Sequence, residues 1–172
     1  MPLEVDTRVN QKLYFSRLQL EQVAASEGRR GRQVAFIESF ALHLYGALTA
    51  YLGELARYHG VEFEPAAGLK GLTESVRLAG KQAPEVAELA RLGAQPSSWL
   101  GALIAYHEVC AFGRGGTVPE PGSEAQRLPL LSLSEPSGKA PEVPVPAPSD
   151  CRAWLDGFSE LLERHRETMV EW

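Results

Sequence analysis

The feature that most constrains the fold of this chain is the stretch 34–58, which is apolar on most sides when it is drawn as a helix. Its apolar side chains recur every three or four residues, the spacing of one face of an α-helix. The first stripe consists of Ile37, Ala41, Leu44, Leu48, Leu52 and Leu55. A second stripe beside it consists of Phe36, Phe40, Ala47 and Tyr51. A helix that is apolar nearly all round needs neighbours on most sides, so the chain is predicted to be an all-α helical bundle built around this segment.

Charged residues argue against a membrane-spanning role for this segment. Glu38 and Glu54 bracket an uncharged run, residues 39–53, which His43 interrupts. That run is shorter than the roughly 20 residues that a membrane-spanning helix needs. We therefore expect the buried core helix of a soluble protein, and no membrane as a partner.

Four further segments have helical patterns. The first is predicted to run from Asp6 or Thr7, either of which can cap it, to about residue 27, where Gly28 ends it. Three shorter helices are predicted at 69–78, 84–92 and 98–112. Pro84 suits the first position of a helix, because its missing N–H has no partner to lose there. The connection between the two long N-terminal helices is short, so we expect them to be antiparallel.

Composition divides the chain into three parts. Residues 1–112 form the predicted core of the bundle, which ends in a broken third layer of short helices. Residues 113–149 hold eight of the twelve prolines and have no sustained periodicity, which predicts a linker rich in proline, glycine and serine. One apolar island, 128–133, interrupts that linker. Residues 150–172 regain a helical pattern, and we expect this C-terminal amphipathic helix to dock back and complete the same domain.

An aromatic stripe marks the C-terminal segment as a candidate interaction helix. Its members are Trp154, Phe158, Leu161, His165, Met169 and Trp172. They recur with helical spacing, and a stripe this apolar is not left in water without inviting association. The sequence leaves two partners open, the core of the same chain or a second copy.

A stripe of small residues lies on the central segment. Gly46, Ala50 and Gly53 follow one another at helical spacing and would let another backbone approach closely. In a soluble bundle, such a stripe predicts a tight crossing with another helix of the same chain.

Composition bounds the class of protein. A net charge of −5 over 172 residues does not favour binding of the whole protein to nucleic acid or to an anionic membrane. Two cysteines, Cys110 and Cys151, do not form a disulfide framework and fit a reducing compartment. The first residues mix charges and lack the apolar region of a signal peptide. We expect a cytoplasmic protein.

The residues that carry chemistry do not form a recognisable catalytic motif. His107 and Cys110 are three apart and can share a helix face, and His43 lies in the core segment, so these three are the candidate pocket. A structural zinc site needs four ligands and a catalytic site three, and buried packing is the more common role for each of these residue types. We expect no catalytic residues, no metal ion and no cofactor, and lean against an enzyme.

The only basic cluster is the turn that contains Arg29, Arg30 and Arg32. Arginines at a turn between helices usually face water or pair with acidic neighbours, and the acidic C-terminal helix is a candidate partner. The alternative is a contact with an anion or with nucleic acid, although the exposed aromatic residues that would strengthen a single-strand interpretation do not accompany the cluster.

Several segments together resemble a known family. They are Thr7–Phe15, Leu42–Leu48, Ser98–Leu100 and Glu171–Trp172. The pattern resembles a family of small bacterial proteins that is classed as a domain of unknown function, and the resemblance covers most of the chain outside the linker. It implies a helical cytoplasmic protein and brings no activity, cofactor or catalytic residue.

The leading hypothesis is a non-enzymatic helical protein that acts through protein–protein contacts, as an adaptor, regulator or self-associating module. The partner is then a protein, a second copy included. A nucleic-acid or nucleotide binder that uses residues 29–32 is the alternative. A small-molecule site or enzyme near His43, His107 and Cys110 has the weakest support.

Overall fold

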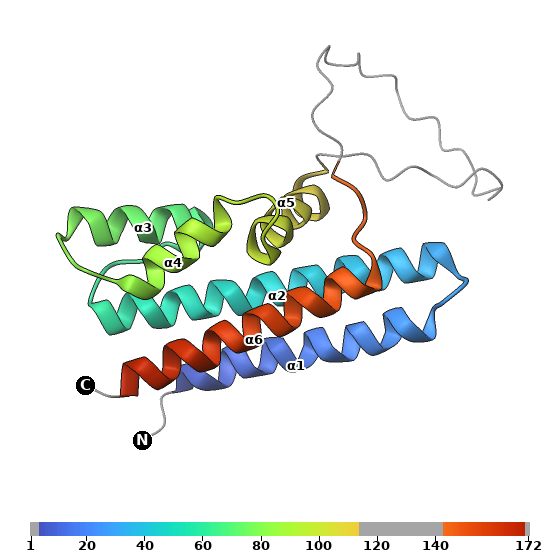
Figure 1. Ribbon diagram of the computed structural model, residues 1–172, viewed down its shortest axis with the longest axis horizontal. Coiled ribbons are helices and arrows are strands. Elements are labelled where there is room, and N and C mark those ends of the chain that lie inside the picture. The colour runs from blue at the N-terminus through green and yellow to red at the C-terminus, as the bar shows by residue number, and fades with distance from the viewer. Residues whose placement is uncertain (1–3, 114–142, 171–172) are drawn as a thin grey trace, which may run out of the picture.

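Three long helices lie side by side in the computed structural model, which describes residues 4–113 and 143–170. They are α1 (Glu4–Ala25), α2 (Arg30–His59) and α6 (Pro148–Val170). Helix α1 runs antiparallel to both α2 and α6 (Figure 1). A short 3₁₀ turn and three shorter helices follow α2; they are η1 (Pro65–Ala67), α3 (Gly68–Leu78), α4 (Pro84–Gly93) and α5 (Trp99–Phe112). Every element in the described ranges is helical, so the predicted all-α bundle is confirmed.

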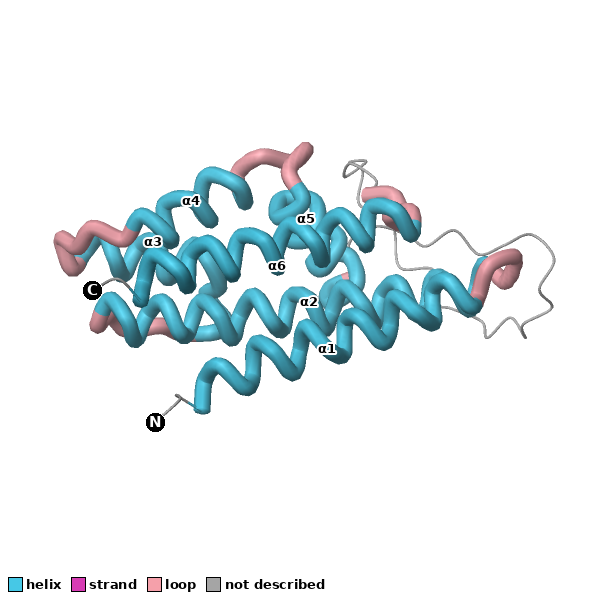
Figure 2. The backbone as a smooth tube through the Cα atoms, turned by 60° about the horizontal axis from the view of Figure 1, so that its bottom comes forward, coloured by secondary structure: helices cyan, strands magenta, loops and turns pink. Residues whose placement is uncertain are grey.

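The short helices form the predicted broken layer. Helices α3 and α5 pack on α2, and α5 also contacts α6. Helix α1 lies on the opposite side of α2 and α6 from these short helices (Figure 2). Pro84 is the first residue of α4, as expected. The Ser98 hydroxyl accepts a hydrogen bond of 2.9 Å from the Gly101 N–H and caps α5. The three short helices therefore lie within one residue of their predicted ends.

Helix ends differ from the prediction in two places. The first helix begins at Glu4, two residues before the expected cap Asp6. The second begins at Arg30 and not at residue 34, so that Arg29 is its N-cap and the other arginines lie in its first turn. Arginine is a good helix former, which explains why the helix extends beyond its apolar part. Gly28 has a positive φ angle of +75° and follows the first helix as predicted, and Gly60, with a φ of +60°, ends the second.

The core is centred on α2. Ten of its side chains are buried, and Tyr51, Phe40 and Leu44 are among those fully removed from water. By length and composition alone this helix could also cross a membrane, but neighbouring helices cover most of its apolar surface. Coverage is incomplete on one flank, where Leu42 keeps 46% of its surface exposed.

The aromatic stripe of the C-terminal segment faces the core of the same chain. Trp154, Phe158, Leu161 and His165 are buried, and Met169 packs at the edge of the core. Trp172 and the apolar island 128–133 lie outside the described residues, as does most of the predicted linker. Of the two partners that the sequence left open, helix α6 packs on the core of its own chain. Its aromatic stripe is part of that core.

Two glycines are required where α5 and α6 meet other backbone or rings. A Cβ on Gly101 would overlap the carbonyl oxygen of Gln95, and one on Gly157 would lie 2.8 Å from Cδ1 of Trp99. The first contact is the tighter constraint, because backbone cannot rotate away as the end of a side chain can.

We predict that Gly101→Ala lowers the free energy of unfolding by at least about 2 kcal/mol, because the added methyl group must displace the chain at Gln95. The loss should appear as a lower midpoint in urea unfolding followed by circular dichroism. Gly31→Ala is the matched control, since a Cβ there meets nothing within 4 Å. Equal stability of the two variants would contradict the packing described here.

Candidate functional site

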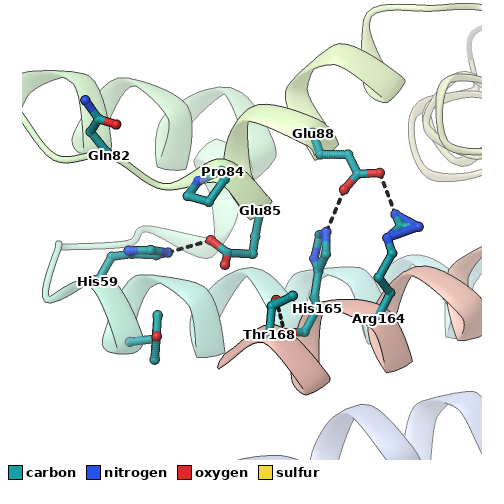
Figure 3. Close-up of a pocket in the computed structure, with 9 residues that line it drawn as sticks. His59, Gln82, Pro84, Glu85, Glu88, Arg164, His165 and Thr168 are labelled. Atoms are coloured by element: carbon teal, nitrogen blue, oxygen red, sulfur yellow. Dashed lines mark hydrogen bonds and ion pairs between the residues drawn. The ribbon is translucent and has the colours of Figure 1, made fainter. Parts of the chain in front are cut away.

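A polar pocket lies between α2, α4 and α6 and encloses about 560 Å³ (Figure 3). Its lining residues come from the end of α2, the connection before α4, the start of α4 and the last turns of α6. They are Tyr58, His59, Gln82, Pro84, Glu85, Glu88, Arg164, His165 and Thr168. Two histidine–glutamate pairs are the chemically distinctive part of this set.

The first pair belongs to a hydrogen-bonded chain that joins all three helices. The Tyr51 hydroxyl lies 2.8 Å from His165 Nδ1, and His165 Nε2 lies 2.8 Å from Glu88 Oε2. Arg164 donates to the other oxygen of Glu88 at 2.5 Å. A carboxylate only accepts hydrogen bonds, so His165 donates from Nε2, and a neutral ring then accepts from Tyr51 at Nδ1.

The second pair lies beside the first. His59 Nε2 is 3.1 Å from Glu85 Oε2, and both side chains keep only 10% of their surface exposed (Figure 3). Lys81 donates to the backbone oxygen of His59, which satisfies an end carbonyl of α2. These contacts fix the end of α2 against the start of α4.

The electrostatics of the hydrogen-bonded chain Tyr51–His165–Glu88 favour a structural role for it. The hydrogen bond from His165 lowers the pKa of Glu88, and Arg164 lowers it further, against the effect of partial burial. Burial raises the pKa of Tyr51, and Glu85 and Glu54 raise it further. Tyr51 is fully buried and both nitrogens of His165 are engaged. A substrate in the pocket would not reach the tyrosine hydroxyl, and these hydrogen bonds join α2, α4 and α6.

A second feature, the α1–α2 groove, opens on the incompletely covered flank of α2 and encloses about 740 Å³. Its residues are Arg8, Lys12, Gly46, Thr49, Ala50, Gly53, Ala56, Arg57, Val61, Phe63 and Pro65. The small-residue stripe of α2 forms its floor, and three cationic side chains stand around it. No aspartate or glutamate is among these described lining residues.

The expected tight crossing at the small-residue stripe is wrong. A Cβ on Gly53 would meet only the Phe63 ring at 3.8 Å and the end of Arg57, and one on Gly46 would meet only the side chain of Lys12 at 3.4 Å. No other backbone approaches these two positions. The fold does not need glycine there, although glycine inside a helix costs about 1 kcal/mol relative to alanine.

The three residues of the candidate pocket are not brought together. His43 lies on α2 with its ring 5.4 Å from that of Phe15 on α1. His107 lies on α5 and stacks on Tyr45 with the ring centroids 3.6 Å apart. Burial lowers the pKa of both histidines.

Neither cysteine has the environment of a reactive thiol. Burial raises the pKa of Cys110 to about 11 and that of Cys151 to about 12, so both stay protonated at neutral pH. Within residues 4–113 and 143–170 no three histidine, cysteine or acidic side chains gather as a metal site.

The basic turn is exposed at the connection between α1 and α2. Arg29, Arg30 and Arg32 all face water, and the Arg32 guanidinium lies 5.7 Å from the centre of the Phe36 ring. This cation–π contact stabilises the Arg32 side chain within its own helix.

Reasoning from sequence missed the polar pocket. The sequence pattern places His165 in the aromatic stripe and does not single out His59. The available signal was the pair Glu85 and Glu88, three apart at the start of α4 and hence on one helix face. Nothing local says which histidines they meet, because the nearer one is 26 residues away and the other 77.

The chain belongs to a family of unknown function (DUF6586), whose model matches residues 1–172. This confirms the resemblance to a domain of unknown function, and the family brings no activity to test against the site. No curated protein and no solved structure matches the chain.

We predict that Glu88→Gln lowers the free energy of unfolding by about 1–3 kcal/mol at neutral pH, because the charged acceptor of His165 and Arg164 is lost. The folded pKa of Glu88 is lowered, so its contribution is present above the unfolded pKa and disappears as pH falls through the folded value. Urea unfolding of the wild type and the variant at several pH values should therefore show a difference that shrinks in acid. Glu74→Gln, in an exposed ion pair with Arg77, is the control and should change stability little.

We predict that Gly53→Ala raises the free energy of unfolding by about 0.5–1 kcal/mol, because alanine favours the helix and its methyl group makes only ordinary van der Waals contacts with Phe63 and Arg57. Thermal unfolding measures the change. Gly157→Ala should have the opposite sign, since its Cβ meets Trp99. Destabilisation by Gly53→Ala would mean that the floor of the groove is already packed.

Proposed function

We propose that this protein acts by non-covalent contact with another protein and that the α1–α2 groove is the contact surface. The observation that carries the proposal is the open flank of α2, where Gly46 and Gly53 keep a concave surface that the fold itself does not require. Glycines that lower the stability of a helix without a packing reason are typical of a surface that serves a function.

The chemistry-bearing groups support a binding role over catalysis. The histidines and glutamates of the polar pocket hydrogen-bond one another, His165 also hydrogen-bonds the buried Tyr51, and the two thiols are kept protonated by burial. A catalytic base or nucleophile needs an atom that can reach the substrate. In the described residues, the cations of the groove are better placed to meet a ligand than these groups are.

Nucleic-acid binding at Arg29, Arg30 and Arg32 is the second candidate, favoured by the exposure of all three side chains at one end of the long helices. It has less support because those arginines line neither the polar pocket nor the α1–α2 groove. The net charge of −5 also disfavours it. Binding of this kind would weaken steeply with salt.

We predict that a photo-reactive residue at Gln11 forms covalent adducts with a partner protein in the cell that makes this chain. Gln11 is exposed beside Arg8, which donates to it at 2.6 Å, so it reports on the rim and leaves the groove open. The matched position is Glu160, exposed on α6. Gly53→Leu, which fills the groove floor, should remove the adducts at Gln11. Identical adducts at both positions, or none at Gln11, would contradict the proposed function.

A further inference from the structure

We propose that the occupant of the α1–α2 groove is an acidic helix of a partner protein, with small side chains on the face that lies against α2. This inference rests on the proposed function, because it names the partner of the same surface.

The position of α6 indicates what shape the groove accepts. Helix α6 faces α1 near Asn10, Leu13 and Arg17, whereas the groove uses Arg8 and Lys12 of the same helix. At roughly 100° per residue these two sets lie on opposite sides of α1. The antiparallel pair of α1 and α2 therefore has two lengthwise surfaces. Helix α6 of this chain lies along one of them and leaves a pocket beside Asn10 and Arg17, and the other surface is open to a helix of the same kind.

The floor of the groove suits a close approach between helices. Gly46, Ala50 and Gly53 add little side chain of their own, so a helix with alanine, serine or glycine on its contact face can approach α2 closely once the ends of Lys12 and Arg57 turn toward its carboxylates. Val61 and Phe63 at one end provide an apolar contact for a larger residue at the end of that helix. Thr49 already donates its hydroxyl to the backbone oxygen of Tyr45 at 3.0 Å, so the floor makes no polar demand on the occupant.

Charge decides which helix fits. Arg8 and Lys12 are four apart on one wall and Arg57 stands near Gly53, so carboxylates along the edges of the incoming helix would meet all three cations. Two copies of this chain placed groove to groove would bring the same cations together, which electrostatic repulsion disfavours. The complementary partner is therefore acidic and is not the same surface of a second copy.

The direct test uses the full chain and a fluorescent, alanine-rich helical peptide of about 20 residues, with glutamates four apart along both edges of one face. Fluorescence anisotropy at low salt should show binding. The same peptide with glutamine at those positions should bind at least about tenfold more weakly, and added salt should weaken the glutamate peptide strongly. Equal binding of the two peptides, or no binding of the glutamate peptide, would overturn the acidic-helix proposal.

Variants assign the binding to the groove. Lys12→Glu/Arg57→Glu should reduce binding at least about tenfold, and Arg91→Glu/Arg152→Glu should leave it unchanged. This control has the same change in charge on α4 and α6. Gly53→Leu keeps every charge and should also reduce binding, which covers the case in which the double reversal folds poorly. Equal loss in both charge-reversed variants, with Gly53→Leu binding normally, would overturn the assignment.

The other occupants are outcomes of the same test. A single-stranded oligonucleotide, or vesicles with anionic lipid, that bind more tightly than the peptide and depend on Lys12 and Arg57 would overturn the proposal. Concentration-dependent self-association that Gly53→Leu abolishes would overturn it in favour of a second copy. Protein adducts at Gln11 without any preference for glutamate would overturn the acidic helix and leave the proposed function standing, whereas absence of adducts counts against the proposed function itself.

Discussion

Removal of α2 from water is the constraint on which the remaining helices depend. Its apolar side chains point in too many directions for one neighbour to cover them, so α1, α3, α5 and α6 each take a part of its surface. Tyr51 shows how closely the arrangement is coupled, because its ring packs near Phe158 of α6 while its hydroxyl hydrogen-bonds His165 of the same helix. Apolar contacts and hydrogen bonds thus both hold α6 in place. The hydrogen-bonded chain extends to Glu88 and so to α4.

In the described residues, the paired histidines and glutamates and the two thiols lie apart from the cations of the α1–α2 groove. Glutamates of α4 face inward and are partnered by histidines and an arginine, and both thiols are buried or half-buried among apolar groups. The cations of the α1–α2 groove face outward over a floor of small residues. Hydrogen bonds and burial engage the first set of groups, whereas the cations of the groove border an open surface, and this contrast supports the proposal that the groove is a contact surface.

The sequence predicted the helices well because their causes are local. Period, capping by Ser98, the first-turn Pro84 and the positive φ of Gly28 and Gly60 all depend on neighbours in the chain. It predicted the site poorly because the relevant contacts are not local. The pairing of Glu88 with His165 depends on how α6 returns to the core after the linker. The small-residue stripe was assigned to an internal crossing because a list of small side chains does not reveal whether a backbone lies over them.

The place of α6 in the chain order has a consequence for synthesis. Domains are made from the N-terminus onward at about 5–20 residues per second, so α1 to α5 leave the ribosome well before Pro148–Val170 follows. During that interval the apolar surface of α2 that later contacts Phe158 and His165 is exposed to water and can associate with other chains. The exposed apolar surface disappears only when α6 docks on α2, so the last described helix of the chain removes the surface that the earlier helices leave open.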